Sequence, residues 1–228
     1  MKAFVTCVLL LIASGSVAFA DTIAVIGTGQ VGSALGPEFA AQGHDIVYGS
    51  RNPDSQKVKD LVAKTPGNAS ATLPQDAIRE ADIVVLAVPG MMVEDIVRGL
   101  GDLSGKIVID PTNPLTGDWS KEIRIGVSTS NGRIIQDAAP DAFVVKAFST
   151  LNWRQMVEPG GDISIPLVGD SDEAKAKVAE IVSGMDLQPI DLGDIDNARW
   201  VEGMTILLLN NRIAGRPPFE YHLRVVNE

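Results

Sequence analysis

Three glycines near the start of the chain have the spacing of a dinucleotide-binding loop. They follow the apolar residues 23–26 and precede a helical pattern over residues 33–42. In such a loop the first glycine permits a tight strand-to-helix turn, the second lets the backbone approach a pyrophosphate, and the third lets helix and strand pack closely. The phosphates would bind free N–H groups at the positive end of the helix dipole. The predicted dinucleotide-binding residues are Gly27, Thr28, Gly29, Gln30, Val31 and Gly32.

The end of the next predicted strand indicates which dinucleotide binds. Ser50, Arg51 and Asn52 follow that strand, and Asp45 lies at its opposite end. An NAD site usually has an Asp or Glu about twenty residues past the glycine motif, where it binds the ribose 2′-hydroxyl. A guanidinium and a hydroxyl suit a 2′-phosphate instead, because arginine forms charge-assisted, often bidentate bonds to phosphate. The sequence therefore predicts NADP, the alternative being that Arg51 is a solvated loop residue.

Strands and helices alternate along the chain, which predicts a parallel sheet with helices on both faces. The expected fold class is α/β: a doubly wound, Rossmann-type parallel sheet with a short C-terminal helical annex. The predicted strands cover residues 22–27, 45–49, 83–88, 106–110, 141–148, 163–168 and 187–191. The predicted helices cover residues 30–42, 54–64, 74–79, 91–99, 171–184 and 196–213, and residues 65–73 are expected to form a loop.

Three further segments lie at the same edge of the predicted sheet, because ligands of open parallel sheets bind beyond the carboxyl ends of the strands. Val88 and Pro89 would lie along the adenosine or the nicotinamide ribose. Asn113 presents an amide between two prolines, unless it forms an ordinary Asx turn. Residues 146–152 follow another strand and lie at the same edge.

The sequence predicts no catalytic acid, base or nucleophile, and no metal site. His44 begins a strand, far from that strand's carboxyl end, and His222 lies in the C-terminal tail. No serine elbow or HExxH motif occurs. Hydride transfer between two bound cofactors needs proximity and orientation but no protein nucleophile.

Residues 1–20 have the pattern of a secretory signal peptide. Lys2 precedes an apolar run, and Ala18-Phe19-Ala20 is an A-x-A cleavage site, so the mature chain would begin at Asp21. A secreted or periplasmic protein is therefore expected, with an uncleaved anchor or a mistaken start codon as the alternatives. The only cysteine, Cys7, lies inside this segment, so the rest of the chain has no thiol chemistry or disulfide.

The formal net charge of −10 argues against a nucleic-acid partner or an anionic membrane surface. The domain boundaries are predicted at 21–192 for the NADP-binding domain and 193–228 for a C-terminal helix and tail. The apolar run at residues 204–209 is too short to span a bilayer. It is either core packing or a buried subunit interface, so a homodimer through the C-terminal helix is one expectation.

Motifs along nearly the whole chain after residue 20 resemble those of the NADPH-dependent F-420 reductases (F-420:NADP oxidoreductases). They are Ile26-Gly27-Thr28-Gly29-Gln30-Val31-Gly32, Gly49-Ser50-Arg51-Asn52-Pro53, Ala87-Val88-Pro89, Thr112-Asn113-Pro114, Lys146-Ala147-Phe148 and Ala198-Arg199-Trp200-x-Glu202. The resemblance implies that the glycine loop and Ser50-Arg51 bind NADP and that coenzyme F-420, a deazaflavin, stacks over the nicotinamide. The Gly-Ser-Arg-Asn-Pro segment is also similar to the cytosolic domain of six-transmembrane metalloreductases, where the acceptor is a flavin. Ser149 departs from the Asn that the family often has after Lys-Ala-Phe.

The leading hypothesis is an NADP-dependent oxidoreductase that passes hydride to a deazaflavin, coenzyme F-420, or to a flavin-like small-molecule acceptor. The alternative is an exported nucleotide-binding module of the same fold without reductase activity. An imine reductase would need a large all-helical partner domain, and the single long helix after Leu192 leaves little room for one.

Overall fold

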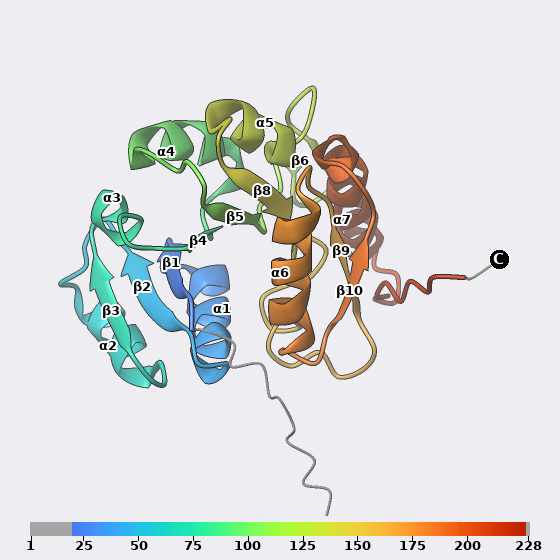
Figure 1. The fold of residues 1–228 in the computed structure, drawn as a ribbon. Helices are drawn as coiled ribbons and strands as arrows, with labels where there is room; N and C mark the ends of the chain where they lie inside the picture. The colour runs from blue at the N-terminus through green and yellow to red at the C-terminus, as the bar shows by residue number, and fades with distance from the viewer. Residues whose placement is uncertain (1–19, 227–228) are drawn as a thin grey trace, which may run out of the picture.

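A six-stranded parallel sheet forms the centre of the computed structural model, which describes residues 20–226 (Figure 1). The strand order is β3-β2-β1-β4-β5-β8, which is the order of the Rossmann fold. The expected α/β, doubly wound parallel sheet is confirmed. The strands are β1 (Thr22–Ile26), β2 (Asp45–Gly49), β3 (Ala69–Thr72), β4 (Ile83–Leu86), β5 (Ile107–Asp110) and β8 (Phe143–Lys146).

Helices cover both faces of this sheet, and each face has its own apolar core. Strand β1 shows why, since Ile23 and Val25 enter one core and Ala24 and Ile26 the other. The first core contains residues of α1 (Gln30–Ala41), α2 (Gln56–Lys64) and α6 (Asp172–Ser183). The second contains residues of α3 (Pro74–Ala77), α4 (Val93–Leu100), α5 (Asn131–Ala138) and α7 (Ala198–Ile213). Two 3₁₀ turns, η1 (Gly90–Met92) and η2 (Ile195–Asn197), precede α4 and α7.

The structure corrects the predicted elements in three places. The expected loop at residues 65–73 contains β3, which pairs in parallel with β2 at the edge of the sheet. The segment between β5 and β8 contains the hairpin β6 (Leu115–Asp118) and β7 (Glu122–Ile125) and helix α5, none of which was predicted. The predicted strands near 163–168 and 187–191 are present as β9 (Ser164–Leu167) and β10 (Gln188–Asp191), but they form a separate two-stranded parallel sheet.

Helix α7 is followed by a tail that returns across β9. Ser164 at the start of β9 donates its N–H to the Tyr221 carbonyl at 3.0 Å, and its hydroxyl accepts the Leu223 N–H at 2.7 Å. The Tyr221 hydroxyl donates to the Met204 carbonyl on α7 at 2.9 Å. The tail therefore connects the last helix to the outer edge of the small sheet.

The predicted signal peptide lies almost wholly outside the described residues, which begin at Ala20. Within residues 20–226, no helix is long and apolar enough to cross a membrane.

Candidate functional site

The glycine loop joins β1 to α1, and two of its glycines are required by packing. Gly27 has a φ of +103°, and a Cβ on it would clash with the Ala87 carbonyl beyond β4. A Cβ on Gly32 would clash with the Gly27 carbonyl. These contacts give both glycines the structural roles that the sequence motif predicts, a tight turn and close helix–strand packing.

Gly29 differs from its two neighbours, because a Cβ on it would meet nothing within 4 Å. It is the N-cap of α1, and no side chain caps this helix. Among residues 20–226, the backbone N–H groups from Thr28 to Gly32 donate no hydrogen bond to the protein. The first N–H of this helix that does so is that of Ser33, which donates to the Gly29 carbonyl at 3.0 Å. Open space above unpaired N–H groups at a helix N-terminus fits a dinucleotide pyrophosphate.

The second predicted segment lies at the same edge of the sheet, directly after β2. The Ser50 N–H donates to the Thr72 carbonyl of β3 at 2.9 Å, and the Ser50 hydroxyl accepts the Asn52 N–H at 3.2 Å. Arg51 and Asn52 are exposed, and Arg51 has no ion-pair partner within the part of the chain that the structure describes. A free guanidinium on an acidic protein, beside a fixed serine, is the donor set that a ribose 2′-phosphate requires.

The loops after β4 and β5 meet each other beside the glycine loop. The Val88 N–H donates to the Leu86 carbonyl at 2.9 Å, which turns the chain after β4, and Pro89 immediately precedes η1. Gly90 lies so close to the Asn113 carbonyl that a Cβ would clash with it. The Asn113 amide donates to the Ser149 carbonyl at 2.8 Å, so it joins the loops after β5 and β8. The twelve predicted site residues therefore lie along one edge of the sheet.

Sequence reasoning missed a buried charged cluster beneath these loops. Lys146 ends β8, and its Nζ lies 2.7 Å from Asp110 Oδ2 at the end of β5 and 2.9 Å from Glu202 Oε1 on α7. All three side chains are 0% exposed. Lys146 Nζ also donates to the Thr112 carbonyl at 2.7 Å. We call these three residues, Asp110, Lys146 and Glu202, the buried triad.

The buried triad also holds the surrounding backbone. Asp110 Oδ1 accepts the Thr112 N–H at 2.8 Å and its hydroxyl at 2.7 Å. Glu202 Oε1 accepts the Asn131 N–H, the first of α5, at 2.9 Å. The Asn131 amide donates to the Gly90 carbonyl at 2.9 Å and to the Thr112 hydroxyl at 2.7 Å. The triad thus fixes the loops after β4 and β5, the start of α5 and the middle of α7 relative to one another.

Electrostatics keep the ammonium charged in this buried place. Burial by itself lowers the pKa of Lys146, but the adjacent Asp110 and Glu202 carboxylates outweigh that effect and raise the pKa above its ordinary value. Burial raises the pKa of the Glu202 carboxyl, and the Lys146 ammonium opposes that rise. Lys146 is therefore charged and lies between the carboxyl groups of Asp110 and Glu202.

The two histidines lie away from this edge. His44 Nδ1 is 3.2 Å from the Asp21 carboxylate, and burial lowers its pKa. His222 in the tail lies 3.1 Å from the Asp162 carbonyl. Residues 20–226 contain no group of three or more His, Cys, Asp or Glu side chains arranged to hold a metal ion.

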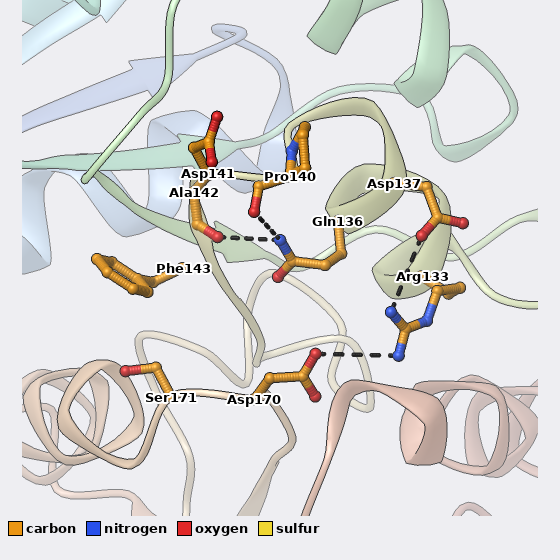
Figure 2. A pocket seen from close by; sticks show the side chains of 9 residues that line it. All are labelled: Arg133, Gln136, Asp137, Pro140, Asp141, Ala142, Phe143, Asp170 and Ser171. Carbon is orange, nitrogen blue, oxygen red and sulfur yellow. Dashed lines mark hydrogen bonds and ion pairs between the residues drawn. The ribbon is translucent and has the colours of Figure 1, made fainter.

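A surface pocket of about 740 Å³ lies elsewhere, between α5, the start of β8 and the start of α6 (Figure 2). Arg133 reaches into it and pairs with Asp137 and Asp170 at 3.8 and 3.9 Å, and more closely with Asp196 at 2.7 Å. Gln136 is held by the carbonyls of Pro140 and Ala142. Phe143 begins β8 here, at the opposite edge of the sheet from the glycine loop, so this pocket is separate from the nucleotide site.

A Rossmann sheet with this glycine loop, a free arginine after β2 and no ribose-binding carboxylate defines the class of NADP-dependent oxidoreductases. Residues 22–114 match the family model described as NADP oxidoreductase, coenzyme F420-dependent. This part of the chain, which includes the glycine loop, Arg51, Val88 and Asn113, is similar to that family.

Individual relatives agree with this family. The F420-dependent NADP reductase of Methanothermobacter thermautotrophicus is 28% identical over 211 residues, which cover 85% of this chain and 90% of the reductase. The metalloreductase STEAP3 of Rattus norvegicus is 28% identical over 192 residues, which cover 83% of this chain but only 37% of that protein. A crystal structure from Arthrobacter sp. FB24, assigned as a candidate F420-dependent NADP reductase, superposes with a TM-score of 0.81 at 29% identity and covers 90% of this chain and 100% of that one.

Proposed function

We propose that the protein transfers hydride between NADPH and a deazaflavin, coenzyme F-420, or a flavin-like acceptor. The observation that carries this acceptor class is the extent of the match with the F420-dependent NADP reductase, which includes 90% of that protein. The chain spans 37% of the metalloreductase that it resembles, so the match to that protein supports the nucleotide domain only.

The residues of this chain would bind and orient the two cofactors. The unpaired N–H groups from Thr28 to Gly32 would hold the pyrophosphate, and Arg51 would bind the 2′-phosphate. Val88 and Pro89 would exclude water along one side of the nicotinamide, and the Asn113 loop would limit the cleft on the other. The bound nicotinamide supplies the hydride, and a proton from solvent completes reduction of the acceptor. This needs orientation rather than a protein nucleophile.

Stopped-flow kinetics test this reaction. NADPH carrying deuterium at the transferred position should be oxidised more slowly than unlabelled NADPH when coenzyme F-420 or a flavin is the acceptor, because the C–H bond breaks in the transfer step. Replacement of His44 or His222 should change the rate little, since neither lies at the carboxyl edge of the sheet. Tight NADPH binding without oxidation by any such acceptor would contradict the reductase and support the binding module.

Arg51→Ala should remove the preference for NADP over NAD. Loss of a charge-assisted hydrogen bond costs about 1.5–3 kcal/mol, so NADPH affinity should fall roughly tenfold or more while NADH affinity changes little. Isothermal titration with both nucleotides measures this. Arg98→Ala is a matched control, because Arg98 is exposed on α4 and pairs only with Glu94 at 2.9 Å. Equal affinities of the wild-type protein for NADPH and NADH would contradict the assignment of Arg51.

We further propose that the protein is exported and cleaved after Ala20. The support is the sequence pattern of residues 1–20, and the described fold begins its first strand at Thr22, immediately after the expected cleavage point. N-terminal sequencing of protein recovered outside the cytoplasm should begin at Asp21. An intact N-terminus on all recovered protein would contradict export and leave the chain in contact with the cytoplasmic NADPH pool.

A homodimer through α7 is the third part of the proposal. Trp200 and Leu207 lie seven residues apart on one face of this helix and are 67% and 61% exposed, so the run at residues 204–209 is only partly buried. Gly203 lies between them, with open space at its Cβ. A second copy across a two-fold axis would place each tryptophan near the glycine of its partner. Sedimentation velocity should show a dimer that Leu207→Glu dissociates; a wild-type monomer would contradict it.

A further inference from the structure

The charges of the buried triad do not balance. It contains one ammonium, on Lys146, and two carboxylates, on Asp110 and Glu202, and all three side chains are completely buried. Glu202 Oε2 has no hydrogen-bond partner among the described residues, whereas Asp110 Oδ2 lies 2.7 Å from Lys146 Nζ. A buried charge in such surroundings is screened far less than a surface charge.

No second cation offsets the extra carboxylate within the described part of the chain. Arg133 is near in sequence to Asn131, but its guanidinium pairs with Asp137 of α5 and with Asp170 and Asp196. The N–H groups of Asn131 and Gly132 donate to Glu202 Oε1 at 2.9 and 3.4 Å. They supply the partial positive charge of a helix N-terminus, which is less than one full charge.

The triad is linked to the loops after β4 and β5, which would border the nicotinamide in the proposed function. Asp110 holds Thr112, the residue before Asn113, through two hydrogen bonds. Asn131, which donates its N–H to Glu202, also donates its amide to the Gly90 carbonyl beside Pro89. Four more unpartnered buried oxygens occur in this region: Asn113 Oδ1, Asn131 Oδ1, Ser149 Oγ and Thr150 Oγ1. Glu202 Oε2 and these four atoms therefore gather around the ends of β5 and β8.

We propose that the extra negative charge of the buried triad favours NADP⁺ over NADPH in this site and so makes bound NADPH a stronger hydride donor. When the hydride leaves the dihydronicotinamide with its electron pair and joins the acceptor, the ring changes from neutral to a charge of +1. A fixed negative charge held under the loops after β4 and β5 would stabilise the second state and not the first. Asp110 and Glu202 are thus positioning and electrostatic residues, and neither exchanges atoms with the substrate.

Equilibrium binding of the two nucleotides, without an acceptor, tests this proposal. The dissociation constants of NADP⁺ and NADPH are measured at pH 8 for the wild-type protein, Glu202→Gln and Asp110→Asn. Each variant removes one charge and keeps the size of the side chain. The ratio of the NADP⁺ constant to the NADPH constant should rise roughly three- to tenfold in each, as expected for one partly screened charge. Glu94→Gln, which removes an exposed carboxylate on α4, should leave the ratio unchanged.

This inference rests on the proposed function, nucleotide binding at the glycine loop. The binding measurements distinguish failure of the proposed function from failure of the electrostatic proposal. A wild-type protein that binds neither nucleotide contradicts the proposed function. A wild-type protein that binds both, with a ratio unaffected by the triad variants, overturns the electrostatic proposal alone. Equal weakening of both nucleotides also overturns it, because that result would come from misplaced loops and not from charge. Either triad variant alone is sufficient for this comparison.

Discussion

Gly29→Val is expected to abolish NADPH binding while leaving the fold intact. The new side chain would project into the open space above the unpaired N–H groups at the start of α1, where the pyrophosphate is expected. Each charge-assisted hydrogen bond lost costs about 1.5–3 kcal/mol, so the affinity should fall by at least about a hundredfold. Isothermal titration gives the affinity, and circular dichroism and the melting temperature report on the fold.

Gly161→Val is the matched control for this substitution. A Cβ on Gly161 also meets nothing within 4 Å, but the residue lies in the exposed loop before β9. NADPH binding should be unchanged in this variant. If Gly29→Val bound NADPH with nearly wild-type affinity, the glycine loop would be a structural turn and the nucleotide would bind elsewhere.

Of the substitutions proposed, Lys146→Met should lower the free energy of unfolding the most. It would leave the Asp110 and Glu202 carboxylates buried without their ammonium, and breaking a buried ion pair in this way costs about 3–5 kcal/mol. Urea denaturation measures the free energy of unfolding. Lys175→Met is the control, since Lys175 also pairs with two carboxylates, but Asp172 is 98% and Asp191 53% exposed. That loss should be under about 1 kcal/mol, and an equal loss in both variants would contradict the special role of the triad.

The pH dependence of this contribution follows from the pKa of Lys146. Burial lowers that pKa, but the two carboxylates raise it by more, so its value in the folded protein lies above the ordinary 10.5. The ammonium therefore stabilises the fold fully below the ordinary value, and this stability is lost only as the pH rises through the folded value. Between pH 7 and 9, the Lys146 ammonium should therefore add no pH dependence to the free energy of unfolding of the wild-type protein, which urea denaturation at several pH values measures.

The sequence predicted the elements that carry apolar runs and could not predict those that lack them. Strands such as Ile83–Leu86 are buried on both sides and read as continuous hydrophobic segments. Strand Ala69–Thr72 has only small side chains and is partly exposed at the sheet edge, so no hydrophobic pattern marks it. The hairpin residues Leu115–Asp118 and Glu122–Ile125 are mostly exposed and polar for the same reason.

The candidate site likewise has parts that the local sequence reveals and parts that only the folded chain reveals. The glycine loop and Arg51 could be found because their chemistry is local in sequence. The buried triad could not, since its members come from β5, β8 and α7 and meet only in the folded chain. A weak signal was present: Asp110 and Lys146 each end an apolar strand and are register partners in the sheet. Opposite charges at the ends of two buried strands indicate an ion pair. The third member, Glu202 on α7, could be placed beside them only from the folded structure.

The tail covers part of the open edge of β9, which has a consequence for aggregation. A two-stranded sheet leaves a row of backbone donors and acceptors open, and such an edge is a template for pairing with another chain. Tyr221 and Leu223 occupy part of this row through Ser164, and Phe219 packs edge-on against Tyr221 with ring centroids 5.6 Å apart. Removing residues 217–226 should uncover this edge of β9 and promote aggregation, because Tyr221 and Leu223 would no longer pair with Ser164.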